Sequence, residues 1–206
     1  MPQVKKSDKR DAIMEAAFGL FSRKGFGATT MADIARAANT TVANLYVYFP
    51  SKIMLLDAVY RPWLRQQLTG IARSVERFRT PHARLKRLLL GVWGDIPAAD
   101  HCFANCLMEA LAAAPQATGK PSDLLAWAEE TLTALMAANL PPSRHGLLQD
   151  RLLAHMIWMA FDGFAINRRI DDVRDIDKIA ELQASLLLGT DTGFAAAQGS
   201  KRTRAG

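Results

Sequence analysis

A stretch of 25 residues near the amino terminus carries three helix start signals and two stop signals, which leaves room only for very short helices. Thr30 can cap one helix, and Asp33 three residues later completes the Thr-x-x-Asp form of a capping box. Thr41 can cap a second helix, which Pro50 ends because proline has no amide hydrogen and restricts the residue before it. Ser51 can cap a third helix. The pattern therefore predicts a short helix, a tight turn, a second short helix and then a longer helix.

Another helix is predicted before this stretch, beginning at Ser7 or Asp8 and ending near Gly25, a residue type that suits the exit from a helix. Asn39 should end the first short helix because asparagine tolerates the left-handed backbone conformation. This helix and the two short helices that follow it together form a small module. Its predicted apolar core consists of Ile13, Ala17, Leu20, Phe21, Ile34, Ala38, Leu45 and Phe49.

These residues carry a resemblance to a known family. The motif residues are Phe21, Gly25, the Thr29-Thr30 pair, Asp33-Ile34-Ala35, the Leu45-Tyr46-x-Tyr48-Phe49 box and Ser51-Lys52. Over about its first quarter the chain resembles the amino-terminal domain of TetR-family transcriptional regulators. The resemblance implies an all-α fold, in which a three-helix helix-turn-helix DNA-binding domain precedes a larger helical ligand-binding and dimerisation domain. It also implies a ligand-responsive repressor that binds a DNA operator.

Four residues depart from the pattern of the family. Asn39 stands where glycine is usual, Val42 where lysine or glutamine is common, Ala43 where glycine is common, and Val47 where an aromatic residue or histidine is common. All four should lie on the side of the module that meets DNA. They therefore bear on which operator sequence is bound, and none of them breaks the fold.

The distribution of charge fits a module that binds phosphates. Residues 1–52 carry eight lysines and arginines against four acidic residues, and the chain as a whole has a formal net charge of +6. We expect a DNA-binding domain at 1–52, a helical effector-binding and dimerisation domain at 53–194, and a flexible basic tail at 195–206. Charge alone does not distinguish a surface that binds nucleic acid from one whose lysines only keep the protein soluble. Charge combined with the helix-turn-helix spacing does.

The second short helix should enter the major groove of double-stranded DNA. Asn44 is the best candidate for base recognition because an asparagine amide can bond adenine through two hydrogen bonds, while Val42 and Ala43 can touch thymine methyl groups. The remaining candidates should bind phosphates, which positions the protein without reading the sequence. They are Thr30, Thr41, Tyr46, Tyr48 and Lys52. The alternative is that Tyr46 packs inside the module and that the two threonines act only as caps.

The rest of the chain is predicted to be helical, with helices from Ser51 towards Phe78, from Pro81, from His101 to Ala114, from Ser122, from Arg144 to Ile170 and from Ile176 to Leu188. Pro62 should bend the first of these. From Leu152 to Phe164 apolar residues occur nearly all round the helix, so it needs one partner inside its own subunit and one outside. We expect the last two helices to form a four-helix interface in a homodimer. The alternative is that they fill a monomeric core.

A small, apolar effector is implied by the resemblance. Seven large side chains on different predicted helices are candidates for an apolar cavity, although residues of this kind are more often plain core. They are Trp63, Trp93, Phe103, Met108, Trp127, Met136 and Trp158. A ligand there should shift the Pro62 helix and move the recognition helices out of register, which requires that it bind two states with different affinity.

Other functional classes receive less support. Cys102 and Cys106 lie four residues apart beside His101, which leaves a metal or redox sensor as an alternative, although no fourth ligand is apparent. No glycine-rich phosphate loop, nucleophile elbow or paired-carboxylate pattern appears, so we expect no enzyme, no cofactor and no resident metal. An all-helical carrier or enzyme without DNA binding is the remaining alternative. With no apolar run that could span a bilayer and no secretion signal, the expected location is the cytoplasm.

Overall fold

The computed structural model describes residues 2–99, 101–113, 123–167 and 174–190, and within these ranges every regular element is a helix. The predicted all-α fold class is confirmed. In the first half of the chain the helices are α1 (Pro2–Lys24), α2 (Met31–Ala37), α3 (Val42–Tyr48), α4 (Lys52–Val75), α5 (Pro81–Leu90), the π-helix η1 (Gly91–Asp95) and α6 (Ile96–Ala98). In the second half they are α7 (Phe103–Ala113), α8 (Asp123–Ala137), the 3₁₀ helix η2 (Pro142–Arg151), α9 (Leu152–Asn167) and α10 (Ile176–Leu188).

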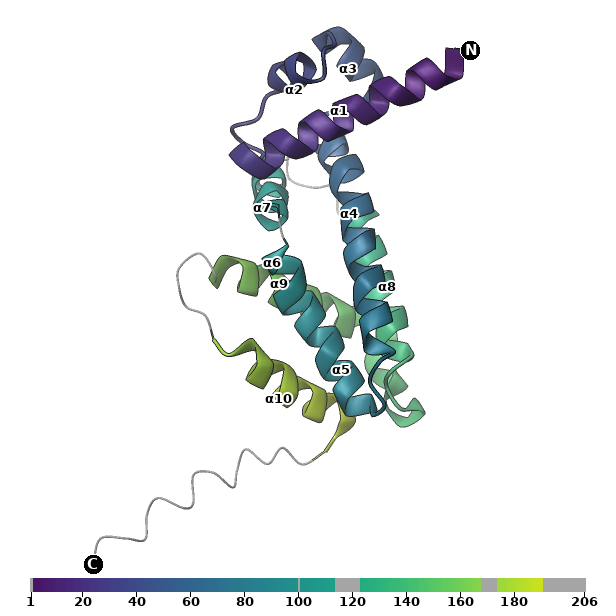
Figure 1. Ribbon diagram of the computed structural model, residues 1–206. Coiled ribbons are helices and arrows are strands. Elements are labelled where there is room, and N and C mark those ends of the chain that lie inside the picture. Colours follow the sequence, from purple (N-terminus) through teal and green to yellow (C-terminus); the bar gives the residue numbers. More distant parts are fainter. Residues whose placement is uncertain (1, 100, 114–122, 168–173, 191–206) are drawn as a thin grey trace, which may run out of the picture. The chain divides into compact units, whose positions relative to one another are not determined.

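The chain forms two compact units. The first consists of Met1–Thr69 and Ile96–Trp127, and the second of Gly70–Asp95 and Ala128–Gly206. Figure 1 shows α1, α2 and α3 of the first unit, and α5 and α10 of the second. This division by contacts differs from the functional division predicted at residues 52 and 53, which remains a prediction.

In the first unit α1, α2 and α3 pack around a shared apolar core, with α2 in contact with both of the others. Seven of the eight predicted core residues are buried, and they are Ile13, Ala17, Leu20, Phe21, Ile34, Leu45 and Phe49. The eighth, Ala38, is half-exposed, because it is the C-cap of α2 and lies beyond the last turn that faces α1. The neighbouring Ala35 is buried in its place, together with the side chains of Phe26 and Met31.

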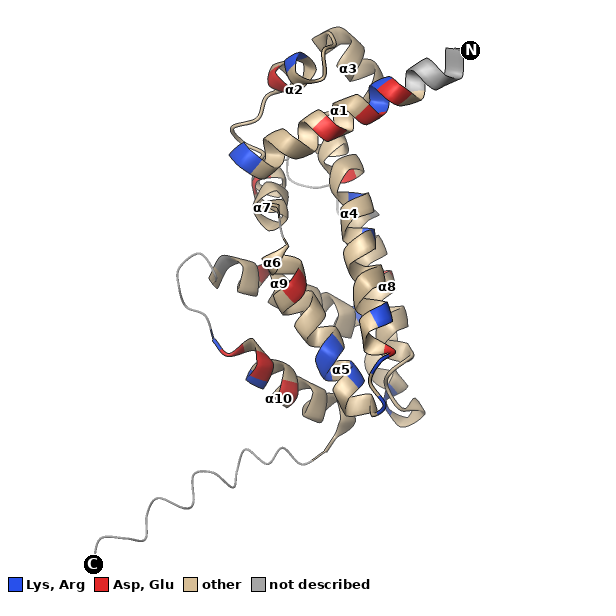
Figure 2. Ribbon diagram, viewed as in Figure 1, with Lys and Arg blue, Asp and Glu red and all other residues tan. Residues whose placement is uncertain are grey.

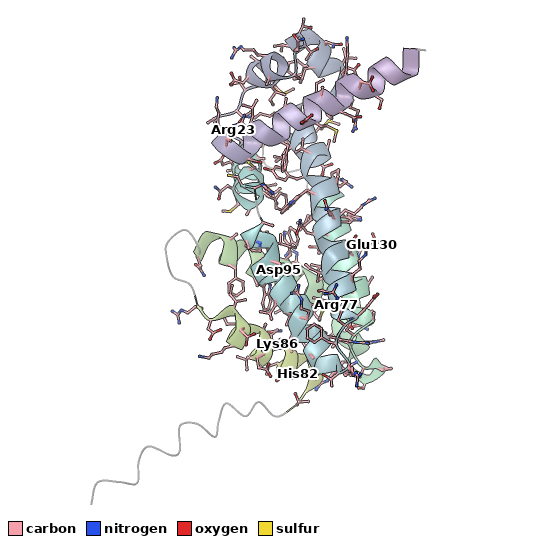
Figure 3. The ribbon with its side chains drawn as sticks, in the orientation of Figure 1. Arg23, Arg77, His82, Lys86, Asp95 and Glu130 are labelled. Atoms are coloured by element: carbon pink, nitrogen blue, oxygen red, sulfur yellow. The ribbon has the colours of Figure 1, made fainter. Side chains whose placement is uncertain are left out.

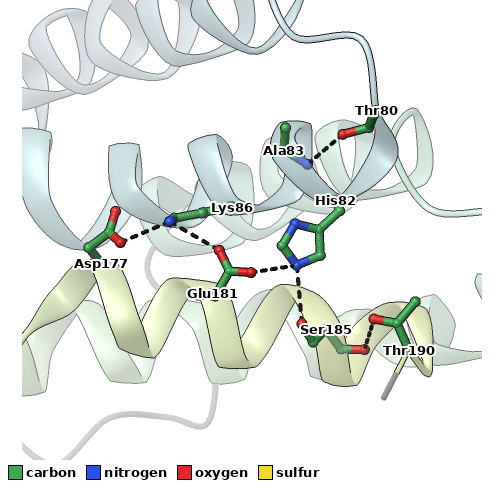
Figure 4. Close-up of polar contacts among 8 residues, drawn as sticks. All are labelled: Thr80, His82, Ala83, Lys86, Asp177, Glu181, Ser185 and Thr190. Atoms are coloured by element: carbon green, nitrogen blue, oxygen red, sulfur yellow. Dashed lines mark hydrogen bonds and ion pairs between the residues drawn. The ribbon is translucent and has the colours of Figure 1, made fainter. Parts of the chain in front are cut away.

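In the second unit α5 and α10 lie side by side (Figures 1 and 3). Their apolar faces meet through buried residues such as Leu85 and Ala184. A polar row closes one edge of the contact, where Lys86 bonds Asp177 and Glu181 at 2.8 and 3.0 Å (Figure 4). Partly exposed ion pairs of this kind are each worth about 0–1 kcal/mol, so the apolar contact provides most of the stabilisation.

Two predicted helix boundaries are wrong. The first helix begins at Pro2 and not at Ser7 or Asp8, consistent with the preference of proline for the first position of a helix. The helix predicted from Arg144 to Ile170 is divided, because residues up to 151 form η2 and only Leu152 begins α9. No residue of η2 is buried, so an α-helix there would have no face to pack.

Backbone angles at three residues mark this break, since Gln149 is extended (ψ 141°) and both Asp150 and Arg151 are left-handed (φ 54° and 59°). Helix α4 runs through Pro62 as one helix, and the predicted bend there remains a prediction. The predicted cap Ser122 lies outside the described residues, as does the predicted tail at 195–206. No helix within the described ranges is both long and apolar enough to cross a membrane.

Candidate DNA-binding interface

Helix α3 begins at a cap that the sequence predicts. Thr41 has extended backbone angles (φ −88°, ψ 154°), and its hydroxyl accepts a 3.1 Å hydrogen bond from the backbone N–H of Asn44. This bond satisfies one of the free amides that every helix start leaves. The helix ends at Phe49, directly before Pro50. Seven residues between these two signals make α3 a short element with little internal stability of its own.

The two faces of α3 differ completely in exposure. Leu45 and Phe49 are buried against the rest of the module, whereas Val42, Ala43 and Tyr46 are exposed. Val47 is 72% exposed and Tyr46 47% exposed, so the alternative in which Tyr46 packs inside the module does not hold. An isolated seven-residue helix that keeps large apolar and aromatic side chains in solvent has a surface available to a partner.

The turn between α2 and α3 is held by a Schellman motif. Asn39 is left-handed (φ 48°), as the sequence predicts for this position. Its N–H bonds the carbonyl of Arg36 at 3.2 Å, and the N–H of Thr40 bonds the carbonyl of Ala35 at 2.9 Å. These are the two bonds that define the motif. They fix the direction in which the chain leaves α2 and therefore the direction in which α3 starts.

The start of α2 carries the complete capping box. The hydroxyl of Thr30 accepts a 3.0 Å hydrogen bond from the N–H of Asp33, and the Asp33 carboxylate accepts bonds from the Thr30 hydroxyl and N–H at 2.7 and 3.3 Å. These bonds, with smaller contributions from the charges of Lys24 and Arg36, hold the pKa of Asp33 below its usual value. Thr30 is exposed but already bonded, so its hydroxyl acts as a cap in the free protein.

Lys52 is used differently from a free phosphate ligand. Its ammonium donates hydrogen bonds to the carbonyls of Phe26 and Thr29, at 2.8 and 2.9 Å, and lies 4.0 Å from the centre of the Phe26 ring. Partial burial lowers its pKa. An ammonium has three donor hydrogens, so one remains for a further acceptor. In the free protein Lys52 therefore anchors the loop before α2 to the start of α4.

Charged residues lie on the neighbouring helices and not on α3 (Figure 2). The nearest charged residues along the chain are Arg36 on α2 and Lys52 on α4. Tyr46 is exposed and Tyr48 half-exposed, and both carry hydroxyls that can donate to phosphate oxygens. The surface thus combines an uncharged helix with hydroxyls and cations around it, and hydroxyls and cations are the groups that can bind phosphates in helix-turn-helix proteins.

Two residues outside the predicted site take part in this region. The hydroxyl of Thr40 accepts a 2.7 Å hydrogen bond from the side-chain amide of Asn44. Glu109 on α7 accepts a 2.6 Å hydrogen bond from the N–H of Gly27, in the loop before α2. The four-residue spacing between Thr40 and Asn44 is a signal that could have been read, whereas 82 residues separate Gly27 from Glu109 and only the fold joins them.

Comparison with known proteins agrees with this geometry. Residues 13–59 match the family described as bacterial regulatory proteins, tetR family. The transcriptional regulator RutR of Escherichia coli (strain K12) is 36% identical over 166 residues, which cover 77% of this chain and 74% of RutR. The chain belongs to the TetR family. It is a DNA-binding transcriptional regulator, and the predicted function of a ligand-responsive repressor is confirmed at the level of the family.

Other members of the TetR family support the same conclusion. The repressor KstR of Rhodococcus jostii (strain RHA1) is 25% identical over 191 residues, covering 88% of this chain and 84% of KstR. A solved structure of the regulator FadR from Bacillus subtilis in complex with stearoyl-CoA has a TM-score of 0.60 and 16% identity. It covers 88% of this chain and 98% of that chain, and at this identity the likeness shows the fold alone.

The seven predicted effector residues of this TetR-family chain fall into both compact units. In the first unit Trp63 packs against Phe103 with ring centres 5.3 Å apart, and Tyr60 contacts both rings. Trp127 lies against Arg65, and Met108 is exposed. The structure thus joins Trp63 and Phe103, which the sequence placed on separate helices.

In the second unit the side chains of Trp93, Met136 and Trp158 are buried. Trp93 donates its indole N–H to the carbonyl of Ile157 on α9 at 2.9 Å and contacts the Phe164 ring. The seven-residue pocket remains a prediction.

The cysteine pair shows no sign of a metal site within the described residues, which contain no group of three or more His, Cys, Asp or Glu side chains that could hold an ion. Burial raises the pKa of the Cys106 thiol to about 12, and the thiol donates to the carbonyl of Phe21. Oxidation proceeds through the thiolate, and burial disfavours that charged form. The environment of Cys106 therefore favours its structural role over the sensor alternative.

Proposed function

We propose that this TetR-family regulator binds a palindromic operator as a homodimer, that α3 of each subunit enters the major groove, and that a small apolar effector changes the affinity for DNA. The observation that carries the proposal is the outer face of α3. Val42, Ala43, Tyr46 and Val47 stay in solvent on a helix whose opposite face is buried, and Asn44 lies among them in the first turn.

Direct base contacts come from the first turn of α3. Asn44 supplies hydrogen bonds, and Val42 and Ala43 supply apolar contacts to thymine methyl groups. Tyr46 and Tyr48 donate to phosphates, and Thr30, Thr41 and Lys52 lie at the helix starts beside them. Because Lys52 also anchors the 26–29 loop, its substitution lowers affinity for every DNA sequence by two routes, through the lost phosphate contact and through the loosened start of α2.

The homodimer rests on α9 and α10 in the second unit. Helix α9 buries Leu153, Ile157 and Phe161 on one side and exposes apolar residues on the other, with Met156 62% exposed. Helix α10 exposes apolar residues as well. We call these residues the exposed stripe, and they are Leu152, Met156 and Met159 on α9 and Leu182 and Leu186 on α10. The buried and exposed apolar sides of α9 support a partner outside its own subunit. Exposed apolar side chains of this kind are what a second copy of the chain covers in a two-fold interface.

Two subunits related by a two-fold axis place their α3 helices about 34–36 Å apart when both read the same side of one DNA turn. This spacing requires an operator with two inverted half-sites.

We place DNA binding in residues 1–52 and effector binding with dimerisation in residues 53–194. The effector binds among the seven predicted apolar side chains, which include the packed pair Trp63 and Phe103.

The experiment that tests the proposal is selection of bound sequences from a random double-stranded DNA pool by the full chain. Recovery of one inverted repeat supports both DNA recognition and the homodimer. The matched pair Asn44→Ala and Tyr48→Phe then separates the two kinds of contact. Asn44→Ala should relax preference at one or two base pairs per half-site, and Tyr48→Phe should weaken all sequences alike. Recovery of no preferred sequence would refute the proposal.

A further inference from the structure

The turn between α2 and α3 fixes a hydroxyl beside the residue proposed to read a base. The left-handed backbone of Asn39 closes the Schellman motif, and the second bond of that motif uses the N–H of Thr40. The backbone of Thr40 is therefore set by α2. Its side chain, with a β-branched carbon, has few rotamers available. The position of the Thr40 hydroxyl is consequently determined before α3 begins.

Asn44 is held by two successive threonines through two different groups. Its backbone N–H bonds the Thr41 hydroxyl at 3.1 Å, and its side-chain Nδ2 donates to the Thr40 hydroxyl at 2.7 Å. The first bond caps the helix. The second sets the orientation of the side-chain amide. Both threonines and Asn44 line an open polar hollow with Lys9 and Asn39, so the amide is accessible from solvent.

The bond to Thr40 limits what the amide can offer to DNA. A free asparagine amide has two N–H donors and one carbonyl oxygen. One donor of Asn44 is committed to Thr40, which leaves the oxygen and a single N–H. In the major groove adenine presents one amine donor at N6 and one acceptor at N7, whereas guanine presents two acceptors at O6 and N7. The remaining groups of Asn44 match adenine and fall one donor short of guanine.

We propose that Thr40 is a specificity-determining residue that acts through Asn44, holding its amide so that each half-site requires an A·T pair at the contacted position. The inference rests on the proposed function, because it assumes that α3 lies in the major groove. Thr40 is a positioning residue here and does not itself contact a base. The other role open to its hydroxyl is a phosphate contact, and loss of such a contact would weaken binding to all sequences alike.

The test uses the full-length chain and a random double-stranded DNA pool, followed by affinity measurements on the selected sequence and its single-base variants. The variants are Thr40→Val, which keeps the shape and removes the hydroxyl, and Thr40→Ser, which keeps the hydroxyl. Asn44→Ala and the double variant Thr40→Val/Asn44→Ala complete a cycle. Thermal melting of each variant provides a measure of folding that is independent of DNA.

The base pair contacted by Asn44 is the one at which Asn44→Ala no longer discriminates between bases. At that pair we expect the wild type to prefer A·T over G·C. Thr40→Val should lower that preference about tenfold, since it frees the second donor and the rotation of the amide. Thr40→Ser should retain it, and the double variant should behave as Asn44→Ala alone. Affinity for scrambled DNA and the melting temperature should stay at wild-type values for Thr40→Val.

The results that overturn the inference are distinct from those that overturn the proposed function. If the wild type selects no sequence, the proposed function fails, and this inference fails with it. If the wild type selects a sequence but Thr40→Val discriminates as well as the wild type, only the positioning role of Thr40 fails. If Thr40→Val loses affinity equally for all DNA sequences, its hydroxyl makes a phosphate contact and the inference is refuted. The same holds if its loss of affinity adds in full to that of Asn44→Ala in the double variant. The inference is also refuted if Thr40→Val has a lowered melting temperature and Thr40→Ser has lost the preference for A·T.

Discussion

The carboxylate of Glu109 on α7 accepts a 2.6 Å hydrogen bond from the backbone N–H of Gly27, in the loop that leads into α2. Lys52 holds the same loop from α4 through two carbonyls. The loop is thus bonded to one anionic and one cationic side chain from helices that follow the helix-turn-helix. Because the loop sets where α2 begins, both side chains constrain the direction of the DNA-binding element.

Removal of the Glu109 carboxylate should release the Gly27 amide. We expect Glu109→Ala to raise the hydrogen-exchange rate of that amide about tenfold, the equivalent of about 1.4 kcal/mol, since hydrogen bonds to charged groups contribute about 1.5–3 kcal/mol and this one is exposed. Glu109→Gln keeps an acceptor oxygen and should show a smaller increase. Exchange measured by mass spectrometry on the loop peptide, with the peptide of α10 as an internal reference, tests this. Equal exchange in all three proteins would contradict it.

The backbone angle of Asn39 gives a prediction for stability. Alanine at a left-handed position costs about 1–2 kcal/mol, whereas glycine adopts it freely. Asn39→Ala should therefore lower the free energy of unfolding by about 1 kcal/mol, and Asn39→Gly should stay within about 0.5 kcal/mol of the wild type. Urea denaturation of both variants measures the difference. A stability of Asn39→Ala equal to that of Asn39→Gly would mean that the turn changes shape.

Gly91, the first residue of η1, lies close to the side chain of Ile71 on α4. A Cβ atom there would lie 2.6 Å from Cγ1 of Ile71, which is itself buried. Gly91→Ala should cost about 1–3 kcal/mol, the usual range for overpacking. Gly70→Ala is a matched control, because nothing lies within 4 Å of the new methyl group and the position is helical and exposed. That control should gain up to about 1 kcal/mol in urea denaturation.

The pH dependence of stability should contain a contribution from Asp162. Burial raises its pKa to about 6, and the charge of His155 opposes this only in part. The folded state then holds a proton that the unfolded state releases near 3.8, so this contribution lowers stability as pH rises from about 4 to 6. Asp162→Asn should remove that slope and increase stability at pH 7 by on the order of 1 kcal/mol, since the side chain is only partly buried. The measurement is the melting temperature of the wild type and of Asp162→Asn from pH 4 to 7. The same change with pH in both proteins would contradict the prediction.

The exposed stripe on α9 and α10 predicts the effect of a charge on assembly. Met156→Glu and Leu186→Glu should each weaken the homodimer by at least about tenfold, because an unpaired carboxylate would be buried between apolar surfaces. Met54→Glu is a control, since Met54 is exposed to a similar degree but lies on α4 in the first unit. Sedimentation across a range of concentrations measures the change. A wild type that remains monomeric at micromolar concentration would refute the interface itself.

Local signals in the sequence were sufficient for the helix-turn-helix module. The caps Thr30 and Thr41, the left-handed Asn39 and the stop at Pro50 each act within four residues, so their effects can be read from the chain. The extent of α10 follows in the same way from its apolar spacing and from Gly189, whose left-handed angle closes the helix. The exposed outer face of α9 also followed from apolar residues on all its sides.

Long-range features were not accessible in this way. Nothing near Gly27 in the sequence indicates that Glu109 bonds it, and the carbonyl partners of Lys52 depend on how the 26–29 loop folds back on α4. The break at Gln149 and Asp150 was missed because apolar residues on both sides continue a helical spacing. The π-helix η1 was missed because its residues Val92 and Trp93 also fit an extension of α5.

The bond between Thr40 and Asn44 has a practical consequence for attempts to retarget this regulator to a new operator. Libraries that randomise one position at a time would test every replacement of Asn44 beside a threonine whose hydroxyl is bonded to the original amide, and would report few functional solutions. Under the proposed positioning role, residues 40 and 44 act as one unit of recognition, and new binding preferences should emerge when they are varied as a pair.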